Sequence, residues 1–423
     1  TQILKDLDDA ISYLPDSYDD KGYGRIDKGA AMAFKGRVLM FYASPMFNPN
    51  NDASRWETAY KANKTALDYL TAQGKGLYKG NFADIWYDEQ NCEAIMVNQF
   101  YYPDHAFDQK NIRPEPLTRD GANDNQAILS LLMAFPKADG TKLELDVTRL
   151  SDPAYNQQFM TEFYTNRDPR FHATIFCPGT IYPCTNVQLE GGQKYWNEQE
   201  VDGKTQMNSL VDFQTGTSIG GGMSGYFQKK GLDESLNNAS VYQAETDWIE
   251  IRFAEVLMNY GECANEIGKT QEALNVLYQI RERAGIENTT GNYGITATTQ
   301  SDIREAYVNE RFVEFAYEGK RWNDLRRWKR FDILNNLKHR STLYAVINDK
   351  ADAEGFDFTK DMFDPEVRKM FHFVYIENVD KDDLYTFNLD EKYLFYPIHK
   401  EALDRNSKLE QNDAWGGTFD PLK

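Results

Sequence analysis

The stretch from Trp248 to Gly285 reads WIEIRFAEVLMNYGECANEIGKTQEALNVLYQIRERAG and decides the fold that we expect. Apolar and small residues recur at steps of three or four through its first half, as at Ile251 and Leu257, which predicts a helix. Gly268 is expected to end this helix, and Thr270 to cap a second one. Because a single helical pair cannot bury both of its faces, the stretch predicts further helices packed beside it.

An earlier stretch repeats this pattern. Lys28 to Ser44, KGAAMAFKGRVLMFYAS, predicts a helix in which Val38–Tyr42 parallels Val256–Tyr260, and Trp56 to Leu70 supplies a second helix after a short loop. Short alanine-rich helices can also resemble one another by chance. The repeat favours a mainly α fold, a tetratricopeptide-like helical-repeat scaffold, with residues 1–75 as its first part and residues 248–423 as its second.

Residues 76–247 differ in composition from the two helical parts. Gly, Asn, Asp, Pro and aromatic residues dominate, which predicts a large, loop-rich inserted lobe. Short strands are expected at Glu93–Phe100 and His172–Phe176, and a helix within Asn125–Phe135. Irregular segments on a rigid scaffold often carry binding residues, so this lobe is the expected ligand-binding part.

Aromatic residues gather at several places in the lobe. Flat rings suit the apolar faces of sugars, and neighbouring polar groups suit their hydroxyls; packing in the core is the alternative for each ring. Tyr226–Phe227 forms one such cluster, whereas the glycine run Gly220–Gly225 matches GxGxxG without a βαβ unit and predicts a loop. The candidate ligand-binding residues are Tyr101, Tyr102, His105, Tyr182, Tyr195 and Trp196.

Ser301 to Arg330 predicts a helix of several turns that Gly319 interrupts. It carries Glu310, Glu314 and Glu318, with arginines close by in the sequence. These carboxylates could act as acids and bases, and the arginines could bind an anion. Carboxylates and guanidiniums in one locally neutral cluster usually pair with each other, and this is the interpretation that we favour.

Composition excludes several classes of protein. The formal net charge of −19 over 423 residues disfavours nucleic acid and anionic lipid, and favours neutral or cationic partners. The four cysteines show no CxxC spacing, so no zinc site and no cofactor is expected; Cys177 and Cys184 could form a disulfide or remain thiols. No apolar run approaches the roughly 20 residues of a membrane span, and the start TQILKDLDDA is not a signal peptide, so we expect a trimmed N-terminus.

Several separated blocks, taken together, resemble the SusD/RagB family of outer-membrane nutrient-uptake lipoproteins of Bacteroidetes. The blocks NERFVEFAYEGKRWNDLRRWK (309–329) and YLFYPIHKEALDRNSKLEQN (393–412) are the most specific. The others, in the family's order, are RIDKGAAMAFKGRVLMFYASPMF (25–47), DPRFHATIF (168–176), SGYFQKK (224–230) and the stretch from Ile249 to Gly285.

The resemblance implies a function. Proteins of this family are held at the outward face of the outer membrane by a lipidated N-terminal cysteine, bind oligosaccharides without cleaving them, and deliver them to a SusC-like TonB-dependent transporter. Family members begin with a signal peptide, that cysteine and an earlier pair of helices, none of which precedes Thr1. Contact with the membrane is therefore expected only through an anchor that this sequence does not contain.

Two alternatives remain open. A RagB-like protein would capture peptide with the same scaffold, through an edge strand and polar groups that match a peptide backbone. A glycoside hydrolase would place two carboxylates on either side of a cleft. No HExxH, GxSxG, Cys/His or metal-ligand pattern supports an enzyme, and the five histidines are scattered. Binding of oligosaccharide without catalysis is the function that we predict.

Overall fold

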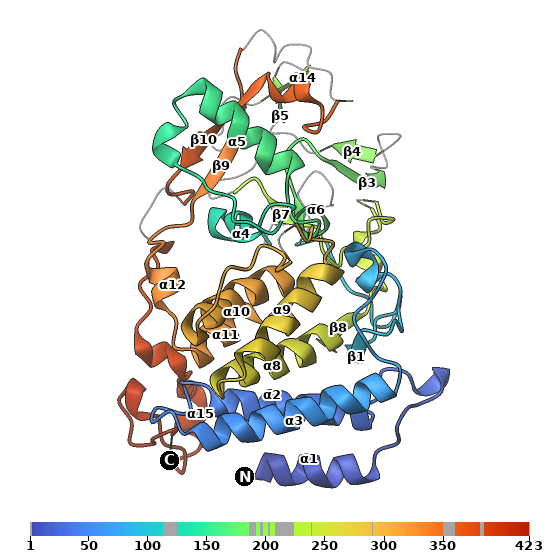
Figure 1. Ribbon diagram of the computed structural model, residues 1–423, viewed down its shortest axis with the longest axis vertical. Helices are drawn as coiled ribbons and strands as arrows, with labels where there is room; N and C mark the ends of the chain where they lie inside the picture. Colours follow the sequence, from blue (N-terminus) through green and yellow to red (C-terminus); the bar gives the residue numbers. More distant parts are fainter. Residues whose placement is uncertain are drawn as a thin grey trace.

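The computed structural model shows a helical body with a mixed region above it (Figure 1). The structure describes residues 2–112, 125–185, 192–194, 198–201, 204–207, 224–237, 239–289, 291–349, 360–380 and 385–422; for residues 181–207 and Asp20 only the backbone is described. The predicted residues Tyr195 and Trp196 and most of the run Gly220–Gly225 lie outside these ranges.

Stacked helices form the lower body, and Figure 1 shows α1, α2 and α3 as its lowest layers, with α8, α9 and α10 tilted above them. The helices α2, α3, α8, α9 and α10 each bury residues along their length, as the repeated apolar spacing predicted, whereas α1 has no fully buried residue. The helices of the body are α1 (Gln2–Tyr13), α2 (Lys28–Ala43), α3 (Ala53–Ala72), α8 (Phe253–Glu266), α9 (Thr270–Arg283), α10 (Gln300–Glu314) and α11 (Arg321–Arg327).

One hydrophobic core joins the two helical pairs that the sequence predicted. Ala66 and Leu70 of α3 pack with Leu257 of α8, Leu277 of α9 and Tyr307 of α10. All five side chains are buried. The mainly α, repeat-like scaffold is thereby confirmed, and the first and second pairs lie side by side although the lobe separates them in the sequence.

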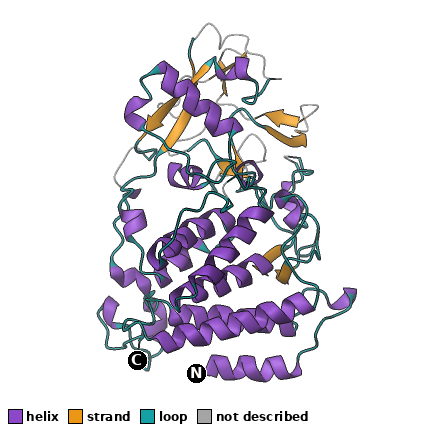
Figure 2. Ribbon diagram, in the orientation of Figure 1, coloured by secondary structure: helices purple, strands orange, loops and turns teal. Residues whose placement is uncertain are grey.

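The upper region mixes helices and strands (Figure 2). Its core is rich in aromatic rings: Phe163 contacts Phe171 and Phe373 edge-on, with ring centroids 5.4 and 5.1 Å apart. Its helices are α4 (Leu129–Ala134), α5 (Pro153–Thr165), α6 (Arg170–Thr174) and α14 (Pro365–Arg368). The division of the chain at residues 75 and 247 stays a prediction, and this core contains side chains from both sides of residue 247.

Among the described residues the strands pair only two by two, and all pairs are antiparallel. The pair closest to the helical body joins β1 to β8, with Val97 opposite Ile249. The pairs are β1 (Ala94–Asn98) with β8 (Trp248–Arg252), β2 (Ile175–Phe176) with β7 (Phe227–Gln228), β3 (Ile181–Thr185) with β4 (Gly192–Lys194), β5 (Glu198–Val201) with β6 (Lys204–Met207), and β9 (Thr342–Ile347) with β10 (Phe371–Ile376). The helices α12 (Asp332–Asn335) and α15 (Lys400–Arg405) lie in the C-terminal segment.

Some predicted boundaries were wrong. Trp248–Arg252 is the strand β8, because it pairs with β1. Its burial alternates only in part: Ile249 and Ile251 are buried and Glu250 between them is partly exposed, but Arg252 is buried as well. Residues 170–174 form α6, and only Ile175–Phe176 is a strand. The helix predicted from Ser301 begins at Gln300, capped by Thr299, and ends at Glu314 before Gly319.

Gly261 sets the distance at which α8 meets its neighbours. A Cβ atom there would lie 1.9 Å from Tyr307 Oη and 2.9 Å from Val276 Cβ. The Tyr307 hydroxyl donates a 2.8 Å hydrogen bond to the carbonyl of Ala273, so it cannot move away without losing that bond. The absence of a side chain at Gly261 therefore lets α8, α9 and α10 pack closely.

We expect Gly261→Ala to lower the free energy of unfolding by about 1–3 kcal/mol, the usual cost of overpacking a core, even though alanine favours helix. Urea denaturation followed by circular dichroism measures the change. Gly76→Ala is the matched control, since no atom lies within 4 Å of the added Cβ. Equal stability of the two variants would contradict the packing role of Gly261.

Candidate functional site

An exposed group of rings lies just beyond the C-terminal end of β1. The chain leaves the strand at Asn98, turns tightly between Tyr101 and His105, and passes beside the short helical turn Val241–Gln243. We call the rings of Tyr101, Tyr102, His105 and Tyr242 the aromatic patch. Three of the six sequence-predicted residues therefore lie on one turn.

Backbone hydrogen bonds hold this turn in place. Tyr101 and His105 exchange two bonds, each with an N to O distance of 2.9 Å. The N–H of Phe107 donates to the carbonyl of Ala244 at 2.8 Å, which fastens the turn to the segment that carries Tyr242. The N–H of Tyr102 donates to a carboxylate oxygen of Glu245 at 2.9 Å. The turn thus has a defined shape that does not depend on the tyrosine rings.

The rings of the patch are open to solvent but supported from below. Tyr101 is 53% exposed, and Tyr102 and Tyr242 are each 46% exposed. Tyr102 and Tyr242 approach edge-on, with their centroids 6.4 Å apart. His105 stacks on Phe100 at 4.6 Å, and Phe100 in turn contacts Phe107. The ring of His105 is therefore backed by packed rings, while the three tyrosines offer exposed ring surface on which a flat apolar group can stack.

Carboxylates surround the patch. Asp247 accepts a hydrogen bond from the N–H of Phe100 at 2.9 Å, while its other oxygen is buried without a partner. Burial raises the pKa of Asp247. Burial and the charge of Asp247 raise the pKa of Glu89. With Glu245 in contact with the main chain of Tyr102, these carboxylates make the surroundings of the patch acidic, which suits the hydroxyls or cations of a ligand.

The other aromatic residues singled out from the sequence lie elsewhere in the structure. Tyr182 lies in β3, where its backbone pairs with Gln193, and its side chain is outside the described residues. Tyr226 and Phe227 are fully buried; Tyr226 packs in the upper core, where its hydroxyl donates a hydrogen bond to the carbonyl of Leu343. Tyr242 was missed by the sequence reasoning, since it stands alone in SVYQAE; its polar neighbours were the signal for its exposure.

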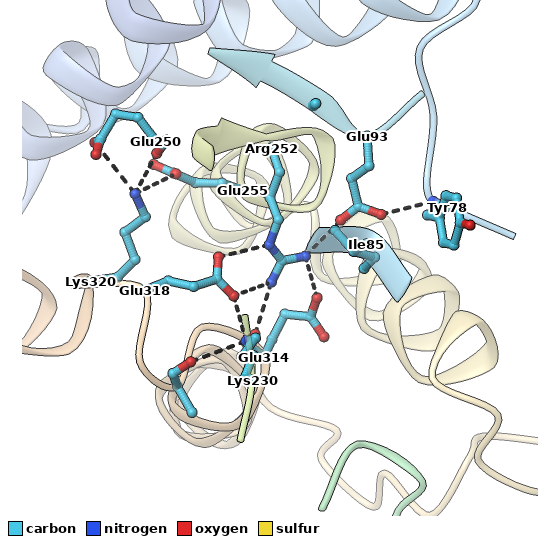
Figure 3. A network of polar contacts seen from close by, with 12 residues as sticks. Tyr78, Ile85, Glu93, Lys230, Glu250, Arg252, Glu255, Glu314, Glu318 and Lys320 are labelled. Carbon is cyan, nitrogen blue, oxygen red and sulfur yellow. Dashed lines mark hydrogen bonds and ion pairs between the residues drawn. The ribbon is translucent and has the colours of Figure 1, made fainter. Parts of the chain in front are cut away.

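Glu314 and Glu318, two of the carboxylates that the sequence offered as acids and bases, belong to a buried network of ion pairs. Figure 3 shows Arg252 at the centre of a buried network, with Nη1 2.6 Å from Glu93 and from Glu314, and Nε 2.8 Å from Glu318. Lys230 Nζ lies 2.5 Å from Glu318, and every one of these side chains is at most 4% exposed. The acids do pair with guanidiniums, as the sequence favoured. The partners of Glu310, Glu314 and Glu318 are not the arginines close by in the sequence, however, but arginines of other segments, namely Arg170, Arg252, Arg281 and Arg283. The nearby Arg311 and Arg327 pair with Asp324 instead.

The electrostatics of the network keep the acids ionised. Burial raises the pKa of Glu314, but the charges of Arg283, Arg252 and Arg170 outweigh it and hold that pKa well below its usual range. The pKa of Glu318 is also lowered, because Arg252 and Lys230 outweigh burial. A carboxylate that stays ionised and out of contact with solvent cannot donate a proton to a substrate at neutral pH.

Other site types find no support in the described part of the chain. It contains no group of three or more His, Cys, Asp and Glu residues that could hold a metal ion. Cys177 is a buried free thiol, and the side chain of Cys184, its partner in the disulfide that the sequence left open, lies outside the described residues. Within the same residues, every helix is too short or too polar to cross a bilayer.

The family of the chain follows from comparison with known proteins. The model of the SusD family matches residues 37–415, which include both helical parts and the upper region. The chain belongs to the SusD family. The resemblance drawn from the sequence blocks is therefore confirmed.

Individual relatives are more distant. A SusD-like protein called P2 from Formosa agariphila is 34% identical over 107 residues, which is 25% of this chain and only a fifth of that relative's length. A solved SusD-like protein from Bacteroides fragilis is 23% identical, with a TM-score of 0.71 over 97% of this chain and 69% of the other. Another from B. fragilis, described as a SusD-like carbohydrate binding protein, is 22% identical, with a TM-score of 0.56 over 78% and 58%. At these identities the solved structures show a shared fold.

We expect Arg252→Leu to lower the free energy of unfolding by about 3–5 kcal/mol, because it leaves Glu93, Glu314 and Glu318 buried without their shared cation. Urea denaturation at pH 7 measures the loss. Lys64→Leu, which breaks the exposed pair with Asp68, is the control and should cost less than about 1 kcal/mol. Similar losses in the two variants would contradict the central role of Arg252.

Proposed function

We propose that this member of the SusD family binds oligosaccharide at the aromatic patch and delivers it, uncleaved, to a SusC-like TonB-dependent transporter of the outer membrane. The observation that carries the proposal is the group of exposed rings formed by Tyr101 and Tyr102 on one turn and by Tyr242 on the neighbouring segment, which the Phe107–Ala244 hydrogen bond fastens to that turn. A relative described as a SusD-like carbohydrate binding protein has a similar fold, which supports the ligand class.

The chemistry of the patch suits sugars. The exposed ring faces can stack on the C–H faces of pyranose rings, and nearby carboxylates such as Glu245 can accept hydrogen bonds from hydroxyls. The site is a surface, so an extended chain can lie across it. Tyr182, Tyr195 and Trp196 remain candidates for further contacts, because all three belong to the same aromatic-rich lobe.

Delivery to a transporter and attachment at the cell surface rest on family membership. The layers formed by α1, α2 and α3 give the body a helical side remote from the upper region, and such a side could face the transporter (Figure 1). Attachment would use a lipid anchor that precedes the residues of this chain. Peptide capture with the same scaffold remains the alternative, and a peptide library screened beside a glycan array distinguishes the two.

We expect Tyr102→Ala to weaken binding to the glycan identified on such an array by about three- to tenfold, since a ring contact contributes roughly 0.5–1.5 kcal/mol. Affinity gel electrophoresis measures the change. Tyr13→Ala removes an even more exposed ring, at 88%, from α1, and should leave retention unchanged. Unchanged migration of the Tyr102 variant would remove this residue from the site.

We also expect the purified protein to leave its glycan ligand intact, because Glu314 and Glu318, two of the carboxylates that the sequence offered as acids and bases, are buried in ion pairs. Incubation with the ligand for a day, followed by a reducing-end assay, tests this. New reducing ends that persist through repeated purification would refute the non-catalytic function.

A further inference from the structure

A cavity of about 220 Å³ lies on the helical body, apart from the rings of the aromatic patch. The loop that leads into α2 covers it with Tyr18 and Arg25, and Tyr69 of α3 lines its side. The strand β1 supplies another wall, from Ala94 to Val97. The volume corresponds to roughly seven water molecules at about 30 Å³ each, which suits a single small molecule.

Two opposite charges line this cavity without meeting. Asp27 caps α2 and accepts a 2.8 Å hydrogen bond from the N–H of Ala30. Lys75 donates a 2.8 Å hydrogen bond to the carbonyl of Ala94. Among the ion pairs of the described residues, none joins Asp27 to Lys75, although each is close enough to affect the pKa of the other.

Partial burial destabilises both charges, although each has a main-chain hydrogen-bond partner. Burial raises the pKa of Asp27 in spite of its hydrogen bonds and the nearby Lys75. Burial likewise lowers the pKa of Lys75 in spite of the nearby Asp27. Each charged form is therefore less stable than in water. A ligand that brings a cation to Asp27 and an anion to Lys75 would stabilise both.

The remaining charges at the cavity leave this pair as its main polar feature. Asp16 is already neutralised, since it lies 2.7 Å from Lys28 Nζ and accepts a hydrogen bond from the Tyr69 hydroxyl. The guanidinium of Arg25 stacks over the ring of Tyr18 at 4.9 Å, at the exposed rim. The rings of Tyr18 and Tyr69 and the side chain of Met96 offer apolar contact between the charges.

We propose that this cavity binds a free α-amino acid. Its ammonium group would pair with Asp27 and its carboxylate with Lys75, while an apolar side chain would pack against the rings and Met96. A neutral sugar of similar size could form hydrogen bonds but would leave both half-buried charges without a partner of opposite charge. An internal residue of a peptide carries neither charge. The ligand class therefore differs from that of the aromatic patch, and the inference does not depend on the proposed glycan function.

Isothermal titration calorimetry with L-leucine tests the proposal, using leucinamide, which lacks the carboxylate, and N-acetyl-leucine, which lacks the ammonium group. We expect L-leucine to bind at least tenfold more tightly than either blocked form, and glucose not to compete. Absence of leucine binding, equal binding of the three compounds, or displacement by glucose would overturn the proposal.

Two variants test which protein side chain binds each charged group of the ligand. Asp27→Asn keeps the helix cap, because asparagine caps as well as aspartate, and should make L-leucine and N-acetyl-leucine bind alike. Lys75→Gln keeps a donor for the Ala94 carbonyl and should make L-leucine and leucinamide bind alike. The exposed controls Asp68→Asn and Lys79→Gln should retain the full preference. Retention of both preferences in the cavity variants would overturn the assignment.

Discussion

The buried guanidinium of Arg252 is the interaction on which the rest of the structure depends. It joins β8 to the segment before β1 through Glu93, to α10 through Glu314, and to the following turn through Glu318. Removing these ions from water costs several kcal/mol for each, so the cluster is tolerated only because every charge has close partners. The helical body and the lobe meet at this cluster, and their relative position is fixed there.

Most of the helical body could be predicted because its signals are local. The three-to-four spacing in Leu257, Leu277 and their neighbours needs only the sequence to be recognised, and the structure buries these residues as expected. The strand β8 was mistaken for the start of a helix because five residues are too few to distinguish a period of two from one of 3.6. These five residues form a strand because they pair with β1, which lies about 150 residues earlier in the chain.

The candidate site was predictable only in part, because some of its residues are neighbours in the sequence and others come together only in the folded chain. Tyr101, Tyr102 and His105 lie within five residues, so their clustering is visible in the sequence. Tyr242 reaches the same surface through the contact of Phe107 with Ala244, which no local pattern reveals. Tyr226 also stands beside another aromatic residue in the sequence, as the exposed tyrosines do, but it is buried. Whether a residue is exposed depends on the strands and helices that cover it, which the local sequence does not show.

The turn that carries the aromatic patch is held by main-chain groups of residues 101, 105 and 107 and by the carboxylate of Glu245. Neither tyrosine ring takes part in those bonds, whereas the ring of His105 adds a 2.8 Å contact of its Nδ1 with the carbonyl of Gln99. Side chains at positions 101 and 102 can therefore be exchanged during evolution at little cost to folding, while the loop keeps its conformation. Divergence in ligand preference can then proceed by substitution on an unchanged backbone. The same rigidity lowers the entropy lost when a ligand is captured, because the loop is already ordered before the ligand arrives.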